Sequence, residues 1–227
     1  MKNLFSLFLV IFAYTYAHAQ AAITEGQIVL ELTNIVTDQP QMKQVLSGST
    51  LTLQSKDNVF RSTTRMMGDQ INIENYYDLN TKDNRIYLNL MGKKILTTVP
   101  DSVQQEKFKD LNDNSIITYD KNDTKEINGF TCYKALVESL QDDGSVSETH
   151  LYITKEVDFP VHLVGGLPQT LEGFPLEMTI RTNGMEMTYS FKNYSEKVDE
   201  NFNTNPEGYT EMTYDEFMAG IGKQMGL

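Results

Sequence analysis

The sequence predicts a mainly β fold of the α+β class, in which an antiparallel sheet built from hairpins carries a few short helices. Three observations support this prediction. Apolar and polar residues alternate along many short segments, turn-forming residues separate these segments, and segments with helical spacing are few and short. Alternation with a period of two is typical of strands that bury one face and expose the other.

The alternating segments run along most of the chain. In residues 176–181, Leu176, Met178 and Ile180 alternate with polar or charged residues. The same pattern contains Ile28, Leu30, Leu32, Leu51, Leu53, Ile71, Ile73, Ile86, Leu88, Leu90, Tyr133, Ala135, Val137, Leu151, Ile153, Met185, Met187, Tyr189 and Phe191. We expect these side chains to form the buried face of the sheet.

Turn residues lie between the alternating segments. Asn183-Gly184 gives the strongest signal, because Asn-Gly between two such segments favours a two-residue hairpin with positive φ at both positions. Residues 56–58, 81–84 and 141–144 are further polar turns. Short turns between successive strands require antiparallel pairing, so the chain is predicted to form a meander of hairpins and not βαβ units.

Three helices are expected. The first covers residues 38–47, with Asp38 as its cap and Pro40 just inside its start. The second covers residues 101–111, with Phe108 and Leu111 on its apolar side. The third follows a capping box near the C-terminus, in which Thr213 and Glu216 have the required spacing of three.

The first residues have the pattern of a cleavable signal peptide. Lys2 provides the positive charge, residues 4–16 are mostly apolar, and Ala17-His18-Ala19 precedes Gln20 as a small-x-small cleavage site. We therefore expect residues 1–19 to be removed between Ala19 and Gln20. No later segment is long and apolar enough to span a membrane, and no Cys follows the site for lipid attachment. The expected product is soluble and periplasmic or secreted.

Residues 20–227 are expected to form a single exported β-rich domain. The polar stretch 110–128 is the candidate linker between an N-terminal and a C-terminal set of hairpins. We interpret the two sets as halves of one continuous sheet, with two separate domains as the alternative.

Charge and cysteine content restrict the partners. The chain has 19 basic and 31 acidic residues and a formal net charge of −12. Such an acidic protein repels phosphate backbones, so no nucleic-acid partner is expected.

Cys132 is the single cysteine, which excludes an internal disulfide, and its surroundings in the sequence favour a buried thiol over a reactive one.

The chain shows no local signature of catalysis. After the expected cleavage site it has two histidines, His150 and His162, without the spacing of a metal site. Neither a nucleophile elbow nor a phosphate-binding loop is present. We therefore assign no catalytic, cofactor-binding or metal-binding residue and expect a protein that is not an enzyme. A hydrolase assembled from distant residues is the third alternative.

Several stretches resemble a known family. They are residues 41–53, 66–68, 91–94, 126–135 and 171–177. The more specific parts are Gly129–Cys132 (Gly-Phe-Thr-Cys) and Gly173–Glu177 (Gly-Phe-Pro-Leu-Glu). The chain resembles the bacterial domain-of-unknown-function family 4412, a group of exported proteins without an assigned activity. The resemblance implies a fold similar to the half-barrel of lipoprotein carriers, which hold acyl chains in the concave face of a curved sheet.

This implied fold leads to a first hypothesis on function. The protein is expected to bind an acyl chain or other apolar molecule, such as a lipid, because a sheet larger than its helices leaves an apolar concavity. The candidate lining is Leu30, Leu32, Leu53, Ile71, Ile73, Leu88, Leu90, Met178, Ile180, Met185 and Met187. The methionines would give a pliable surface. In the alternative, these residues pack a dry core, and the protein is a structural or interaction module with an envelope protein as its partner.

Overall fold

The computed structural model describes residues 22–225, apart from 142, 162, 163, 183, 200 and 203. The predicted signal peptide, with Ala19 and Gln20, lies outside the described residues. So do His162 and Asn183 of the predicted Asn-Gly turn.

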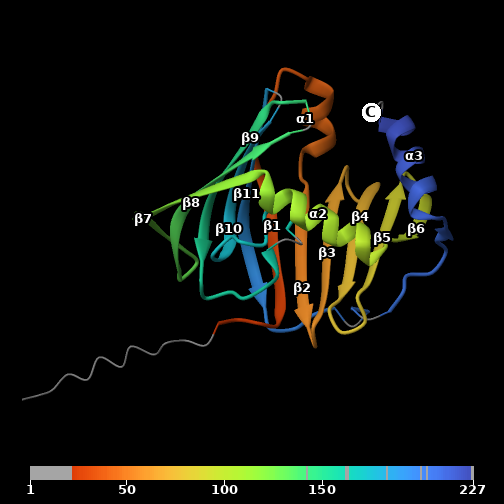
Figure 1. Ribbon diagram of the computed structural model, residues 1–227, viewed down its shortest axis with the longest axis horizontal. Coiled ribbons are helices and arrows are strands. Elements are labelled where there is room, and N and C mark those ends of the chain that lie inside the picture. Colours follow the sequence, from red (N-terminus) through yellow and green to blue (C-terminus); the bar gives the residue numbers. More distant parts are fainter. Residues whose placement is uncertain are drawn as a thin grey trace, which may run out of the picture.

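The described residues form twelve strands and three helices, as the sequence predicted for a mainly β protein (Figure 1). The strands are β1 (Gly26–Val36), β2 (Thr50–Lys56), β3 (Val59–Met66), β4 (Ile71–Asp78), β5 (Asp83–Leu90), β6 (Lys93–Thr98), β7 (Ser115–Ile127), β8 (Phe130–Leu140), β9 (Val146–Thr154), β10 (Phe174–Thr182), β11 (Met185–Ser195) and β12 (Thr210–Glu211). The helices are α1 (Pro40–Leu46), α2 (Asp101–Asp113) and α3 (Tyr214–Met225).

All twelve strands belong to one sheet, in the order β12-β6-β5-β4-β3-β2-β1-β11-β10-β9-β8-β7. Strands β1 to β6 form one antiparallel meander and β7 to β11 form another. Strands β1 and β11 pair over nine residue pairs and join the two meanders. Only the short β12 is parallel to its neighbour, β6.

The prediction of a linker at residues 110–128 was wrong. This stretch contains the end of α2 and then β7, which pairs with β8 from Ser115 to Ile127. Because β7 is an edge strand, most of its side chains remain exposed, and its composition is correspondingly polar. Ile117 and Tyr119 are the alternating positions that pack against the core.

Two-residue turns fix the register of three hairpins. Asp57 and Asn58 have φ angles of 52° and 65° between β2 and β3, and Asn128 and Gly129 have 50° and 89° between β7 and β8. Met91 and Gly92 join β5 to β6 in the same way. Positive φ at both positions gives a turn whose twist matches that of the flanking strands.

The helix ends differ in how well the sequence predicted them. The capping box is confirmed, because the backbone N–H of Glu216 donates to Thr213 Oγ1 at 3.3 Å and the Glu216 carboxylate accepts from the Thr213 backbone N–H at 3.0 Å. The prediction that Asp38 caps α1 was wrong. Gln39 is the capping position and makes no side-chain capping bond, although Pro40 does begin the helix.

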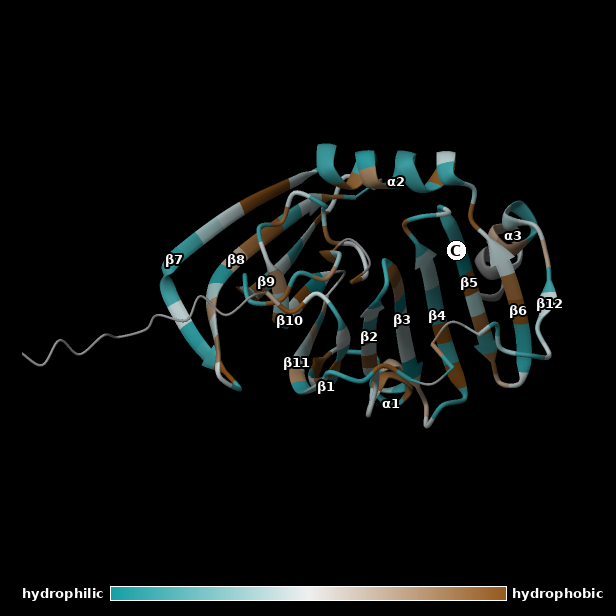
Figure 2. Ribbon diagram, turned by 90° about the horizontal axis from the view of Figure 1, so that it is seen from below, coloured by the Kyte–Doolittle hydropathy of each residue, from teal (hydrophilic) through white to brown (hydrophobic). Residues whose placement is uncertain are grey.

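The sheet curves strongly, and α2 lies across its open concave side (Figure 2). Register shifts interrupt three strand pairs, β1 with β11, β7 with β8, and β9 with β10. Such bulges bend the strands and increase their twist. Pro175 lies at the shift between β9 and β10, where a residue without a backbone N–H is tolerated.

The concave face holds the main apolar core. A long connection between β9 and β10, residues 155–173, folds back onto this face. Its buried side chains, each at most 9% exposed, are Val157, Phe159, Val161, Val164, Leu167 and Leu171. They pack with Ile28, Leu30 and Leu53 of the sheet in one cluster. At the β6 edge, Phe217 of α3 packs against Leu88 and Ile95. The concave face is therefore covered by an irregular segment as well as by helices.

The convex face is crossed by residues 196–209, which we call the strap. The strap leaves β11 in the middle of the sheet and reaches β12 at the edge. It is fastened by Arg61, whose guanidinium donates to the carbonyl oxygens of Asn201 at 3.1 Å and Thr204 at 2.9 Å. The chain thus crosses the sheet on both faces, as α2 on one and as the strap on the other.

Replacement of Phe159 by Ala is expected to destabilise the fold by about 3–5 kcal/mol, because the ring is 6% exposed and packs against Phe174 with ring centroids 5.6 Å apart. Urea unfolding followed by circular dichroism measures the change. Leu140→Ala is the matched control, since Leu140 is 55% exposed. Equal effects of the two substitutions would contradict the assignment of residues 155–173 to the core.

Cys132 is expected to be unreactive in the folded protein. Its side chain is fully buried, and burial, together with the nearby carboxylates of Glu126, Glu156 and Glu177, raises the pKa of the thiol to about 12. About one molecule in 10,000 then carries the thiolate at pH 8. A colourimetric thiol reagent should react at least ~100-fold more slowly with the native protein than with the protein in urea. Similar rates in both states would show that the thiol is accessible.

Candidate functional site

A cavity of about 320 Å³ lies on the concave face, between the sheet and the elements that cover it. We call it the concave cavity. Its lining residues are Asn75, Asn84, Ile86, Val99, Gln104, Lys107, Phe108, Leu111, Gly165, Gly166 and Tyr214. Strands β4 and β5, helix α2, the 155–173 connection and the start of α3 all contribute, so the cavity forms only when these separate segments come together.

Helix α2 presents one stripe of residues to the concave cavity. Gln104, Lys107, Phe108 and Leu111 follow the spacing i, i+3, i+4 and i+7 that places side chains on one face of a helix. The Asn84 side chain on β5 donates a hydrogen bond to Gln104 Oε1 at 2.7 Å. This bond fixes the start of the helix against the sheet and sets one end of the cavity.

The lining of the concave cavity is mixed, with apolar residues beside the polar side chains of Asn75, Asn84, Gln104, Lys107 and Tyr214. Ile86, Val99, Phe108 and Leu111 provide the apolar part. Lys107 is the one charged residue of the lining and is exposed to solvent. A chain with 31 acidic residues thus contributes no carboxylate to this lining. A site of this kind favours a molecule with an apolar body and a neutral or anionic end.

The eleven residues that the sequence predicted as a ligand lining share one face of the sheet. The strand register places Leu30, Leu51, Thr64, Ile73 and Leu88 in one row across β1 to β5, and the other predicted residues lie in rows of the same face. Leu30, Leu53 and Met178 are buried in the main core with residues 155–173.

The remaining predicted residues are spread along the same face. Leu88 is buried beside α3, and Ile73 and Leu90 pack against that cluster. Leu32, Ile71, Ile180, Met185 and Met187 are half-buried. None of the eleven is among the lining residues of the concave cavity, and their role in ligand binding stays a prediction.

Some of the residues that line the concave cavity had been expected to face inward. Phe108 and Leu111 were expected on the inner side of the second helix, and Ile86 in a strand. Gly165, Gly166 and Tyr214 were not anticipated, because they reach the cavity only through the path of the chain between β9 and β10 and through the position of α3.

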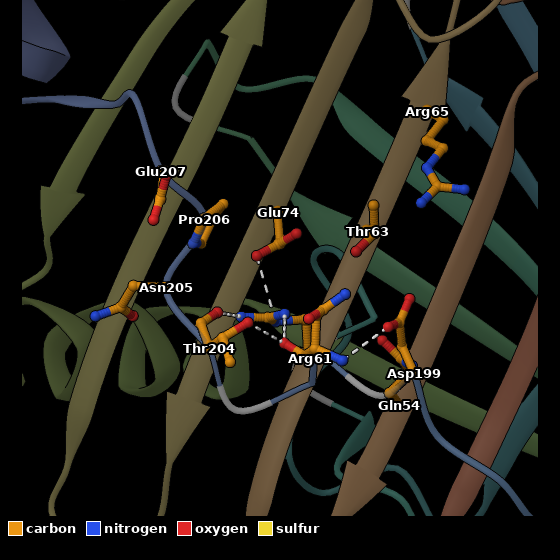
Figure 3. Close-up of a pocket in the computed structure, with 11 residues that line it drawn as sticks. Gln54, Arg61, Thr63, Arg65, Glu74, Asp199, Thr204, Asn205, Pro206 and Glu207 are labelled. Carbon is orange, nitrogen blue, oxygen red and sulfur yellow. Dashed lines mark hydrogen bonds and ion pairs between the residues drawn. The ribbon is translucent and has the colours of Figure 1, made fainter.

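A second and larger cavity, of about 520 Å³, lies on the convex face between the sheet and the strap (Figure 3). We call it the convex cleft. Its sheet wall contains Gln54, Arg61, Thr63, Arg65 and Glu74, and its strap wall contains Asp199, Asn201, Thr204, Asn205, Pro206 and Glu207. No sequence pattern singled out these residues; those of the sheet wall lie on β2, β3 and β4, and those of the strap wall lie outside the strands.

An ion pair lies in the middle of the convex cleft. Arg61 Nε is 3.3 Å from Glu74 Oε1, and the two side chains are only 8% and 15% exposed. Burial raises the pKa of Glu74, and the charge of Asp199 acts in the same direction, while Arg61 and Arg65 oppose the shift. The electrostatic attraction between the two side chains is therefore strong, because little water screens their charges.

Further polar contacts hold the strap beside this ion pair. The Asn205 side-chain oxygen accepts hydrogen bonds from Arg85 at 2.6 Å and from the Tyr87 hydroxyl at 2.7 Å. The ring of Tyr76 lies between the guanidinium groups of Arg61 and Arg85, at 5.7 and 5.6 Å from its centroid. These contacts make the strap wall a fixed surface facing the sheet wall.

The chain was compared with known proteins at the level of sequence and of structure. Its sequence matches no protein-family model and no curated protein. PNGF-II superposes with a TM-score of 0.51 at 8% identity and covers 87% of this chain, which in turn covers 33% of PNGF-II. The chain therefore spans about a third of the length of PNGF-II, and the similarity shows a common fold alone.

Two further solved structures give lower TM-scores. LppX from Mycobacterium tuberculosis has a TM-score of 0.38 at 8% identity, with 77% of this chain and 89% of LppX covered. LprF from Mycobacterium bovis has a TM-score of 0.37 at 10% identity, with 81% and 90% covered. Membership of family 4412 stays a prediction, since no family model matches.

The helices of the described part of the chain include none with the length and apolar character needed to cross a membrane. The described His, Cys, Asp and Glu residues include no group of three or more that could hold a metal ion.

Replacement of Arg61 by Met is expected to destabilise the protein by about 3–5 kcal/mol at pH 7, because it leaves the Glu74 carboxylate buried without its partner. The double variant Arg61→Met/Glu74→Gln should lose less stability, since it also removes the charge of the Glu74 carboxylate. Glu74 already has a raised pKa in the folded state. The protonation of Glu74 therefore stabilises the folded state most at pH values below the pKa that Glu74 has in the unfolded chain. This stabilisation is lost as the pH rises through the pKa of Glu74 in the folded protein.

The difference in the free energy of unfolding between the single and the double variant should accordingly become smaller as the pH is lowered and Glu74 becomes protonated. Chemical unfolding at several pH values measures it. A difference that does not depend on pH would show that the loss comes from packing of the Arg61 side chain and not from the unpaired carboxylate.

Proposed function

We propose that the protein is an exported binding protein that holds one single-chain amphiphile in the concave cavity. The cavity itself carries this proposal: it lies on the inner face of a curved sheet and combines four apolar residues with polar ones, of which Lys107 is exposed to solvent. A volume of about 320 Å³ is at the lower end of the range for small-molecule sites. It suits a single acyl chain better than a lipid with several chains.

The position of Lys107 supports an anionic head group. The apolar residues Ile86, Phe108 and Leu111 would surround the chain, and the Lys107 ammonium group lies at the exposed border. A carboxylate placed there meets one positive charge and no acidic residue of the lining. The gain is modest, because solvent screens an exposed ion pair.

The expected location agrees with such a role. The signal peptide predicted at residues 1–19 would deliver the protein to the periplasm or the medium, where an apolar molecule needs a carrier or is sensed. The resemblance to family 4412 supports the same role, since it implies the fold of carriers that hold acyl chains. The proposed role is binding and requires no cofactor.

A second candidate function is an interaction module of the cell envelope. It is favoured by three exposed apolar residues close to the free β7 edge. Ile116 is 69% exposed, and the paired residues Leu140 and Val146 are 55% and 57% exposed. An edge strand with apolar neighbours can pair with a partner chain. Under this alternative the concave cavity stays without a ligand.

Dodecanoate is a suitable probe for the proposed function, with isothermal titration calorimetry on the mature chain as the measurement. Leu111→Trp should fill the cavity and weaken binding by ~10-fold or more, which corresponds to about 1.4 kcal/mol. Glu106→Trp is the matched control, because Glu106 is exposed on the same helix and does not line the cavity.

Lys107→Met should weaken dodecanoate binding by about 2–5-fold and leave the binding of dodecanol unchanged.

Native mass spectrometry of the purified protein then shows whether an acyl compound is retained from the cell. The proposal fails if dodecanoate does not bind, or if Leu111→Trp and Glu106→Trp bind it equally well.

A further inference from the structure

The convex cleft has features of a binding site that are independent of the concave cavity. Three polar side chains form its floor although they are largely buried: Gln54 is 6%, Arg61 8% and Thr63 5% exposed. Burying polar groups is unfavourable unless they are hydrogen-bonded. The cavity beside them, about 520 Å³, falls within the range of small-molecule sites.

Some of these buried groups lack a hydrogen-bonding partner. Within the described part of the chain, Arg61 Nε and Glu74 Oε1 are buried without a hydrogen bond and have only their mutual ion pair at 3.3 Å. Gln54, by contrast, donates to Gln27 at 3.1 Å. Thr63 lies between Arg61 and Arg65 along β3 and therefore at the centre of the sheet wall (Figure 3).

The two walls of the convex cleft carry opposite charges. On the sheet wall Arg61 and Glu74 neutralise each other, which leaves Arg65 as the net positive charge. Its only ion pair in the described chain is a long one of 3.9 Å to Asp69, and its side chain is 51% exposed. On the strap wall Asp199 and Glu207 are negative and exposed. A ligand between the walls meets a cation on one side and carboxylates on the other.

We propose that the convex cleft binds a small zwitterion of the amino acid or dipeptide class. The carboxylate of the ligand lies at Arg65 and accepts a hydrogen bond from the Thr63 hydroxyl. Its ammonium group faces the strap, whose Asp199 and Glu207 carboxylates attract it. Hydrogen bonds between charged groups are stronger than neutral ones, and this arrangement uses one at each end of the ligand. The strap is therefore one wall of a binding site as well as a connection between β11 and β12.

The dipeptide Ala-Ala and its end-blocked forms test this proposal by isothermal titration calorimetry with the mature protein. The free dipeptide is expected to bind. Acetylation of its amine or amidation of its carboxylate should each weaken binding by about ten-fold or more. Sorbitol, an uncharged polyol of comparable polarity, should not bind.

One single and one double substitution then assign each end of the ligand to a wall. Arg65→Met should bind the free and the amidated dipeptide equally weakly, because it removes the carboxylate contact. Asp199→Asn/Glu207→Gln should likewise remove the difference between the free and the acetylated dipeptide. Lys93→Met is the control, since Lys93 is an exposed lysine outside the cleft lining, and it should behave as the unchanged protein.

Three outcomes would overturn the proposal. They are the absence of Ala-Ala binding up to millimolar concentration, equal binding of the free and the doubly blocked dipeptide, and binding of sorbitol in place of the dipeptide. Arg65 is half exposed, so its replacement should leave the fold intact, which the unfolding midpoint of the variant verifies. Dodecanoate binding in the concave cavity should be the same in all these variants.

Discussion

The pairing of β1 with β11 is the constraint on which the rest of the structure depends. It joins the first and the last long strand of the sheet and thereby places two meanders side by side. Strands β6 and β7, which are consecutive in the chain, consequently lie near opposite ends of the sheet, so their connection has to cross it. The chain that leaves β11 must also cross the sheet to reach β12 at the far edge. Because α2 occupies the concave face, the strap takes the convex one. Both cavities follow from these two crossings, since each lies between the sheet and a segment that passes over it.

The two faces of the sheet are stabilised by different interactions. On the concave face, apolar side chains from residues 155–173 fill most of the space, and their contribution scales with the apolar area removed from water. Pro160, Pro168 and the pair Gly165-Gly166 disfavour a long α-helix in this segment. On the convex face the strap is held by directed polar contacts of Arg61, Arg85 and Tyr87. A concave surface that encloses apolar groups and a convex surface that anchors a strap through hydrogen bonds can each hold a different kind of molecule.

The strands could be predicted from the sequence because alternation reflects a local property, the different environments of the two sheet faces. Ile28 and Leu30 alternate and are fully buried, as expected. The capping box at Thr213 was predictable for the same reason, since its bonds join residues three apart. Strand β7 was missed because an edge strand buries few of its side chains.

The two cavities were harder to predict from the sequence than the strands. Arg61 is a polar residue on a strand, and it becomes buried only when the strap, some 140 residues later, covers it. The concave cavity likewise requires Ile86, Leu111 and Gly166, from three separate segments, to line one space, and no local pattern encodes that arrangement.

The 13 residues of α2 have a consequence for how this architecture can change during evolution. The helix is about 20 Å long and ties the first meander to the second across the open side of the sheet. It thereby fixes how far the two halves can separate. Insertion of one helical turn would add about 5.4 Å to this tie and allow a wider opening without changing any strand or any strand register. Deletion of a turn would narrow it. The length of one helix is thus an independent variable through which related chains could adapt the same sheet to ligands of different size.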